Sequence, residues 1–488
     1  MANGVRVRRD VYKLSPWDDA LLWYARAVDE MRRRPVNDPT SWRYQTAIHD
    51  YNESDDPLGQ SGDKRPPKSE QTKYWRQCQH GTWYFLPWHR MYLAYFEQIV
   101  AATIVKLGGP EGWSLPFWNY SDDSNPEARL IPPAFRERTL PDRRPNPLRI
   151  DARAPGANTG DNIAGAQQVN LQPAMNERRF AGVSSGGSPG FGGPQTGFHH
   201  TDGTVGTLER LPHGAMHGAV GGKDGWMSMF HTAPLDPIFW LHHSNIDRLW
   251  SVWRNSRAEN VNPVDETWRS MSFAFHDARG SPVSLRCDQV IDTEAAPLHY
   301  RYEGVSTPSG PARPITEGLT VPEPVPEMVG ANEEPVVLRG QVAETRLAVS
   351  PPTGPGRVTL ESISRAPELY LNFENITSES GPTTYAVFIN LPAGVNPREH
   401  MDHFVGILPM FGVREASRPG PGHSGTGLTY ALEAGEVARR LEARQAWNPR
   451  DVRITFVPWY EGEGPRPALE SLSHPIRVGR VSLYVVAQ

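Results

Sequence analysis

Two histidine-rich stretches constrain this chain more than any other feature. The first covers residues 78–90, and the second consists of residues 213–217 followed by residues 236–247. Their histidines are His80, His89, His213, His217, His242 and His243. Residues four apart lie one turn above each other on the same helix face, so His213 and His217 can hold a single ion. Aromatic residues flank both stretches, and the pattern predicts a metal centre held between helices.

The donor type indicates which metal to expect. Neutral imidazole suits copper, zinc, iron and nickel and adds no charge to the site. No carboxylate lies between His80 and His89 or between His213 and His217. Zinc enzymes usually use three protein ligands, so two all-histidine groups favour two ions, and copper is the natural choice. Each histidine taken alone could instead be an ordinary core residue, and the aromatic residues beside them are expected to be core packing.

Two longer motifs carry a resemblance to a known family. The first consists of His80, Phe85, His89, Arg90 and Glu97, and the second of Asp236, Pro237, Phe239, Trp240, His243 and Asp247. These motifs resemble those of the tyrosinase, catechol oxidase and haemocyanin family of type-3 copper proteins, over roughly residues 5–302. The resemblance implies a mainly α-helical central domain in which a four-helix bundle holds two coppers that bind dioxygen.

The resemblance also implies a ligand set. The first copper would be held by His49, His80 and His89, and the second by His213, His217 and His243. Helix geometry agrees that only one of His242 and His243 faces inward, because neighbours point about 100° apart. His199 and His200 are weaker candidates, since six ligands are already assigned.

Two further residues are expected to support the ligands. Cys78 precedes His80 by two residues, and in part of the family such a cysteine forms a thioether to the ligand imidazole; a buried free thiol is the alternative. The only other cysteine is Cys287, so a disulfide framework is excluded, although one bridge between the two stays open. Asp247 lies one turn beyond His243 and is expected to orient a ring nitrogen, unless it is a surface residue paired with a nearby cation such as Arg248.

Four residues around the predicted centre bear on its chemistry. Glu209 resembles the family's water-holding glutamate and is the candidate proton acceptor; a solvated glutamate at a helix start is the alternative. Gly214 stands where many monophenol-hydroxylating members have Asn, which weakens the case for that activity. Gly218 is expected to leave the pocket floor open. Phe230 stands where the family places a gate ring over the second copper, or it is plain core.

The resemblance implies a polyphenol oxidase of the catechol oxidase or tyrosinase type. The expected reaction oxidises o-diphenols to o-quinones and reduces dioxygen to water, with weak monophenol hydroxylation as an addition. An o-aminophenol oxidase forming quinone imines and a haemocyanin-like oxygen-binding protein are the alternatives. A degenerate binding protein would lack ligands, and none is missing. The expected partners are dioxygen and a phenolic small molecule.

Composition excludes other classes of protein. The 50 basic and 55 acidic residues give a net charge of −5, and no basic run favours nucleic acid or an anionic membrane. No apolar run is long enough to span a bilayer, and the first residues lack a signal-peptide core. We therefore expect a cytoplasmic protein, with export by a helper protein as the alternative. The sequence does not indicate an oligomeric state.

The 488 residues are too many for one compact domain, so we expect an α+β multidomain chain. The copper domain would cover residues 1–302, with helices that begin at Ser15, at Phe85 (ending at 107) and at 236–237 (ending near 253). A Pro-rich linker would cover 303–333. Short alternating runs predict a C-terminal β-sandwich over 334–488, with strands at 336–338, 358–360, 369–371, 385–388, 452–456 and 481–486.

The C-terminal region resembles the domain that covers the copper entrance in plant polyphenol oxidases and keeps them latent. A merely stabilising module is the alternative. His400 and His403 in this region are expected to be surface residues, with a role in copper delivery as a second reading.

Overall fold

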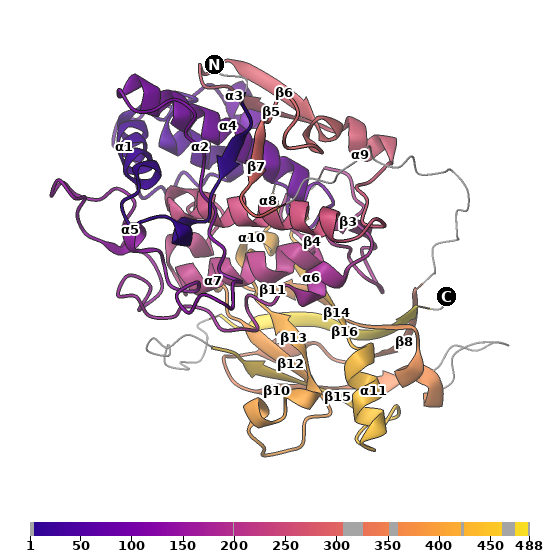
Figure 1. The fold of residues 1–488 in the computed structure, drawn as a ribbon. Coiled ribbons are helices and arrows are strands. Elements are labelled where there is room, and N and C mark those ends of the chain that lie inside the picture. Colours follow the sequence, from indigo (N-terminus) through magenta and orange to yellow (C-terminus); the bar gives the residue numbers. More distant parts are fainter. Residues whose placement is uncertain are drawn as a thin grey trace.

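The computed structural model describes residues 4–198, 200–305, 326–350, 360–420, 424–460 and 474–486. Helices dominate the N-terminal part and strands the C-terminal part, and Figure 1 shows the two parts stacked, with the helices above the sheet. Among the described residues, no helix combines the length and apolar character that crossing a bilayer requires.

Five helices build the N-terminal part around the predicted metal centre. They are α1 (Asp19–Arg33), α2 (Trp42–His49), α4 (Phe85–Lys106), α7 (Ala215–Gly221) and α8 (Ile238–Ser256). Shorter helices are α3 (Lys68–Tyr74), α5 (Pro133–Arg136), α6 (Gln172–Asn176) and α9 (Glu266–Ser270). Whether the ligand-bearing helices form a four-helix bundle around two coppers stays a prediction.

Local sequence explains where these helices begin. The predicted start of α1 at Ser15 is wrong, because the Asp18 side chain accepts the Ala20 N–H and caps the helix there. In α8 the Asp236 carboxylate accepts the Ile238 N–H at 3.1 Å, as a helix entry at Asp236–Pro237 requires. The prediction for α4 is confirmed to within one residue at its end.

Helices α4 and α8 pack through aromatic rings. Phe96 and Trp240 stack with centroids 3.3 Å apart, and Tyr92 lies 4.8 Å from Trp240. Nearly every α4 side chain up to Ile104 is buried, which explains why its sequence is apolar on all sides. This packing holds the ligand-bearing faces of the two helices against each other.

Small strands tie the N-terminal part together. They are β1 (Arg6–Arg8), β2 (Ala181–Gly182), β3 (Gly193–Pro194), β4 (Gly203–Thr204), β5 (Ser272–His276), β6 (Pro282–Arg286) and β7 (Tyr300–Tyr302). β1 and β7 pair in parallel, so the two ends of the helical part meet. Strands β5 and β6 form an antiparallel pair.

The C-terminal part is one sheet with two helices. Its strands are β8 (Pro326–Ala331), β9 (Val336–Leu338), β10 (Ala343–Val349), β11 (Glu368–Thr377), β12 (Tyr385–Ile389), β13 (Phe404–Leu408), β14 (Leu428–Glu433), β15 (Val452–Pro458) and β16 (Ile476–Val486). The order is β13-β12-β15-β10-β8-β16-β11-β14-β4, with β9 beside β16. The helices are α10 (Val413–Ala416) and α11 (Gly435–Ala443).

This sheet differs from the expected β-sandwich, which is not confirmed. The strands follow one continuous path, and β4 from the N-terminal part extends its edge by pairing with β14. Phe373 of β11 and Phe456 of β15 are not on neighbouring strands, yet their rings lie 5.6 Å apart, so the sheet curls over its own core. Five of the six expected strands are present; residues 358 and 359 of the sixth lie outside the described residues.

Each part has its own hydrophobic core, but the two parts are joined. Phe411 of the C-terminal part belongs to the helical core, and Val205 belongs to the core of the sheet. A third cluster places Leu211 and Ala215 against Phe388 and Ile407. Residues 326–331 of the predicted linker form β8, which pairs with β16, so the C-terminal sheet begins before the predicted boundary at 334. Otherwise we retain the division into 1–302, 303–333 and 334–488 as a proposal; residues 306–325 of the linker lie outside the described residues.

Candidate metal centre

The structure brings the six predicted histidines together from four helical segments and one loop. His49 ends α2, His80 lies in the loop before α4, and His89 lies in the first turns of α4. His213 lies in a π-helical segment, Glu209–Gly214, that leads into α7, and His217 lies in α7 itself. His243 comes from α8. None of the six side chains is more than 3% exposed.

The six rings lie close together both within and between the two predicted groups. In the first, the His49–His80, His49–His89 and His80–His89 centroids lie 5.3, 5.7 and 5.3 Å apart.

In the second group, the centroids of His213, His217 and His243 lie 4.7 to 5.5 Å apart. The His217 and His243 Nε2 atoms approach to 3.4 Å. The groups adjoin where His89 stacks on His243 at 4.5 Å. The arrangement therefore offers two three-histidine sites side by side.

Main-chain carbonyls fix the orientation of four rings. Each of the four bonds through Nδ1 to a carbonyl oxygen at 2.8–3.0 Å: His49, His89, His213 and His217. The carbonyls belong to Phe230, Phe85, Glu209 and Met227, respectively. Since a carbonyl can only accept, Nδ1 carries the proton and Nε2 keeps its lone pair for a metal.

The unpaired nitrogens show that the donor set fits copper. The Nε2 atoms of His49, His89 and His213 are buried and have no hydrogen-bond partner, and neither nitrogen of His80 has one. Burial and the neighbouring imidazoles hold the pKa of all six rings well below the ordinary value, so the rings are neutral. Buried polar atoms left unpaired are costly, and neutral imidazoles are the donors that copper accepts.

His242 is a buried residue that the sequence reasoning missed. Its ring lies 4.8 Å from His217 and 5.4 Å from His213, and the ligand atoms of His213, His217, His242 and His243 all lie within 4.8 Å of one another. The expectation that only one of the adjacent pair faces inward is wrong, because both rings border the second group. The Tyr120 ring also packs against His242, with centroids 5.6 Å apart.

Cys78 lies beside the first group. Its Sγ, with one ligand atom each from His49 and His80, falls in a set within 4.8 Å. The thiol also lies 3.3 Å from His200 Nδ1, and that nitrogen lies 2.8 Å from the Cys78 carbonyl. Both cysteines are free in the structure. The Nδ1 of His200 is therefore engaged by Cys78; His199 lies outside the described residues.

Glu209 is buried, not a solvated helix-start residue. Both of its carboxylate oxygens lie 3.1 Å from the Gly81 N–H, next to the first group. Burial raises its pKa to about 8. A carboxyl group with this environment can exchange a proton near neutral pH.

Both glycines adjoin the C-terminal part, whereas the predicted gate ring lies against the first histidine group. Gly214 lies under Pro409 and Phe411, which a Cβ at this position would meet at 3.4 and 3.5 Å. Gly218 faces Pro382, so it adjoins the C-terminal part and not an open floor. Phe230 stacks on His80 at 4.4 Å and meets His49 edge-on, which puts it against the first group and not over the second copper as expected.

Phe411 covers the centre. Its ring stacks on His217 with centroids 3.9 Å apart and also meets Phe230 at 4.9 Å. A small cavity remains beside it. The cavity is lined by residues of both parts, among them His80, Glu209, His213, Pro409, Phe411 and Tyr430.

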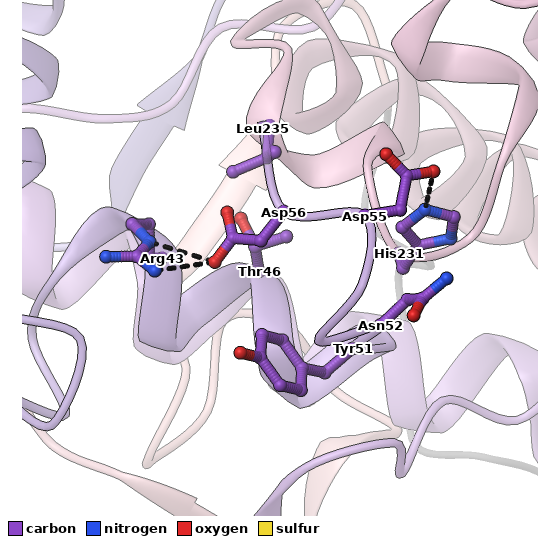
Figure 2. Close-up of a pocket in the computed structure, with 8 residues that line it drawn as sticks. All are labelled: Arg43, Thr46, Tyr51, Asn52, Asp55, Asp56, His231 and Leu235. Carbon is purple, nitrogen blue, oxygen red and sulfur yellow. Dashed lines mark hydrogen bonds and ion pairs between the residues drawn. The ribbon is translucent and has the colours of Figure 1, made fainter. Parts of the chain in front are cut away.

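A second, polar pocket lies nearby but does not contain the ligands. Figure 2 shows Arg43 paired with Asp56 and His231 paired with Asp55 at its walls. The pocket has a volume of about 230 Å³, and none of the six histidines lines it. Its charged groups are already paired with one another.

Asp247 has a structural role that differs from the predicted one. Its carboxylate accepts hydrogen bonds from Arg90 at 2.5 Å and from the Tyr300 and Tyr302 hydroxyls at 2.6 Å, and Arg8 lies 3.4 Å away. His243 Nδ1 has no partner, so the expectation that Asp247 orients this ring is wrong. The aspartate instead joins α4 and α8 to the β1–β7 pair.

Comparison with known proteins assigns the class of this centre. Residues 39–256 match the common central domain of tyrosinase, and residues 262–315 match the polyphenol oxidase middle domain. Residues 325–486 match a domain of unknown function. Tyrosinase HcTyr1 of Hahella sp. (strain CCB-MM4) is 37% identical over 499 residues, covering 98% of this chain and 99% of that protein. The chain belongs to the tyrosinase family of type-3 copper proteins.

More distant relatives agree. The chloroplastic polyphenol oxidase of Malus domestica is 28% identical over 297 residues, which cover 58% of this chain and 46% of that protein. The chain thus spans about half the length of this plant relative. Solved structures of latent aurone synthase (TM-score 0.62, 21% identity, 99% and 90% of the chains covered) and latent apple tyrosinase (0.60, 20%, 99% and 97%) share the fold. The protein is accordingly an oxidoreductase of the tyrosinase and polyphenol oxidase type that holds two copper ions and oxidises phenols.

Proposed function

We propose that this protein oxidises o-diphenols to o-quinones while one dioxygen is reduced to two waters for every two diphenols oxidised. The observation that carries the proposal is the pair of buried three-histidine groups, in which the Nε2 atoms of His49, His80, His89 and His213 have no partner and those of His217 and His243 lie 3.4 Å apart. His49, His80 and His89 would hold one copper ion and His213, His217 and His243 the other. When bound, the copper pair supplies the redox chemistry with dioxygen, and the protein supplies geometry and a dry site.

The side chains around the histidines suit this reaction. Among the described residues that line the cavity, Glu209 is the one with a carboxyl group, and in its deprotonated form it can accept a proton from an incoming hydroxyl group. Phe230 and Phe411 wall the same cavity with apolar rings that exclude water. Gly214 offers no side-chain amide to help Glu209 deprotonate a monophenol, so we assign diphenols as the principal substrates.

Oxygen uptake by copper-loaded, full-length protein with catechol tests the reaction, with His243→Ala as the inactive control. Appearance of the quinone together with uptake of half an equivalent of dioxygen per catechol is expected. A monophenol and an o-aminophenol tested in parallel separate tyrosinase and aminophenol oxidase activity from the proposed one. Two coppers per chain, reversible dioxygen binding and no turnover of any phenol would instead identify an oxygen carrier.

We also propose that the C-terminal part keeps the enzyme latent. Phe411 on His217 and Pro409 above Gly214 support the proposal, because both come from the turn after β13 and border the cavity. Cleavage within the 303–333 linker, followed by release of the C-terminal part, should raise turnover. Unchanged turnover after complete cleavage and separation would show that this part only stabilises the fold.

A thioether between Cys78 and His80 completes the proposed centre. The closeness of Cys78 Sγ to the first group supports it, and forming the bond removes two hydrogens in an oxidation for which dioxygen is the oxidant. Intact mass of the reduced, unfolded protein should then lie about 2 Da below the sequence mass. Cys78→Ser should restore the full mass expected for its sequence. A wild-type mass equal to that of the free thiol would contradict the cross-link.

A further inference from the structure

A second set of metal-binding side chains lies in the C-terminal part. His400, Asp402 and His403 gather where a single turn of 3₁₀-helix, Met401–His403, leads into β13. One ligand atom from each residue falls within 4.8 Å of the others. Outside the histidine groups of the copper centre, this is the one such cluster in the part of the chain that the structure describes.

The turn brings the two imidazoles near each other. His400 precedes the 3₁₀ turn and His403 ends it, so the two residues stand three apart across a single turn. The His403 N–H donates to the His400 carbonyl at 3.1 Å, which closes this turn. The two ring centroids lie 6.2 Å apart.

His403 is prepared as a metal ligand in the same way as the copper ligands. Its Nδ1 donates to the Ile389 carbonyl at 2.8 Å, which fixes the tautomer and leaves the Nε2 lone pair free. That Nε2 lies 3.9 Å from an Asp402 carboxylate oxygen. The side chain is buried to 7% exposure, so the ring has little freedom to turn away.

Asp402 pairs with an arginine side chain that a bound metal ion could displace. Its carboxylate pairs with Arg444, which follows α11 and has a side chain that is 61% exposed. An exposed ion pair contributes little, about 0–1 kcal/mol, and Arg444 can turn into solvent. A divalent cation would therefore face a carboxyl group and two imidazole nitrogens, with Arg444 as only a weak competitor.

We propose that His400, Asp402 and His403 form a mononuclear site for a divalent transition-metal ion, with Cu²⁺ the preferred occupant. Two imidazoles and a carboxylate suit Zn²⁺, Ni²⁺ and Cu²⁺, and Cu²⁺ binds such donor sets most tightly. Bonds of about 2.0–2.1 Å require the ligand atoms to close to roughly 3 Å from one another. The partly exposed His400 and Asp402 side chains supply that movement while His403 stays in place.

The site is distinct from the copper pair but lies on the same structural element as Phe411. β13 begins directly after His403, and its five residues span about 16 Å before the turn that carries Phe411. An ion at this site would fix the start of the strand whose far end positions the ring over His217. Binding of this ion can be measured whether or not the protein oxidises phenols.

Titration of the copper-loaded full-length protein with Cu²⁺ tests the site. Electron paramagnetic resonance should show a mononuclear Cu²⁺ spectrum with nitrogen hyperfine splitting that grows to one additional spin per chain. Equilibrium dialysis supplies the apparent Kd. The absence of a third bound ion, or a spectrum without nitrogen splitting, would overturn the proposal.

Variants test which side chains bind the Cu²⁺ ion. His400→Ala and His403→Ala should each weaken the apparent Kd at least tenfold, while His474→Ala, which removes an exposed histidine elsewhere in the same part, should leave it unchanged. Arg444→Ala should tighten binding severalfold because the competing cation is gone, a gain that misfolding could not produce. Retention of the signal in the double variant His400→Ala/His403→Ala, or weaker binding in Arg444→Ala, would refute the assignment.

Discussion

The phenyl ring of Phe411 lies flat on the imidazole of His217, with centroids 3.9 Å apart and planes inclined by 10°. Phe411 comes from the turn after β13 and His217 from α7, so this contact joins the C-terminal part to the metal centre. Phe411 belongs to the helical core and not to the core of its own sheet. The Phe411 ring therefore blocks the cavity beside the metal centre, and removing the ring should open this cavity.

Phe411→Ala should raise kcat/KM for catechol roughly two- to tenfold in the full-length protein. Stacked aromatic pairs are worth about 0.5–1.5 kcal/mol, and loss of that energy shifts the population toward the open site by the corresponding factor. Steady-state oxygen uptake measures it. Phe404→Ala is the matched control, since Phe404 lies at the start of the same strand, β13, and its ring contacts Phe388 and Trp459. An equal rise in both variants would mean that the sheet had merely loosened.

Substitution of His242 and substitution of its neighbour His243 should have different effects on the copper content of the protein. His243→Ala should bind fewer than two coppers per chain and lose at least a hundredfold in turnover, because a ligand position is gone. His242→Ala should keep two coppers, with turnover reduced by roughly ten- to a hundredfold, as is usual when a residue that supports metal ligands is changed. Metal analysis together with oxygen uptake checks both. Loss of a copper from His242→Ala alone would reverse the ligand assignment.

Helical pattern and spacing predicted the positions of the main metal-binding elements. The apolar run after Phe85 and the Asp236–Pro237 entry gave α4 and α8, because long buried helices follow from local sequence. Histidine spacing and the family resemblance together predicted six residues that the structure gathers in one place. The predicted roles of these residues stay predictions until metal binding is measured.

Contacts between distant segments were not predictable in the same way. Burial of His242 depends on Tyr120, which is 122 residues away in sequence, and neither residue has a local pattern that reveals the other. The position of Phe411 depends on how the C-terminal sheet docks on the helical part. Strand β4, which pairs with β14, was not predicted because it lies in a Gly-rich loop. Asp247 was misassigned because helical spacing places it near His243, whereas the Arg90, Tyr300 and Tyr302 side chains draw its carboxylate to the opposite side.

Asp247→Asn should destabilise the fold without acting as a copper-ligand mutation. Although burial opposes ionisation, Arg90 and Arg8 hold the pKa of Asp247 below its ordinary value, so the charge is present. Breaking a buried ion pair costs about 3–5 kcal/mol, and the free energy of unfolding should fall by that amount. Tyr300→Phe, which removes the single hydrogen bond from that hydroxyl to Asp247, should cost only about 1 kcal/mol. Chemical denaturation measures both; normal stability with lost copper would restore the original role of Asp247.

Asp202 should stabilise the contact between the N-terminal and C-terminal parts. One of its carboxylate oxygens accepts from the N–H and hydroxyl of Ser424 at 3.0 and 2.9 Å, and from those of Thr426 at 3.3 and 3.1 Å. Asp202→Asn should weaken docking by about 1.5–3 kcal/mol, because hydrogen bonds to a charged group are lost. Faster protease cleavage of the C-terminal part and higher catechol turnover are expected. Asp142→Asn, at an exposed site bonded only to Arg144, is the control.

Glu415 should make the stability of the closed arrangement depend on pH. This carboxyl group of α10 is buried beside Phe230, whose N–H lies 3.4 Å from one of its oxygens. Burial raises its pKa above the ordinary value of 4.5, and Asp50 adds to the shift while His231 opposes it. The folded protein therefore keeps a proton that the unfolded chain has already lost.

The sign of the effect follows from this difference in bound protons. The contribution of Glu415 is fully present below pH 4.5 and is lost as the pH rises through the raised pKa of the folded state. In Glu415→Gln the group stays neutral, so the free energy of unfolding of this variant, relative to wild type, should increase with pH by at most about 1.4 kcal/mol per unit. Denaturant titrations of the copper-free proteins at a series of pH values measure it. The exposed Glu436→Gln is the control, and a relative stability that falls with rising pH would show that Glu415 is ionised in the folded protein.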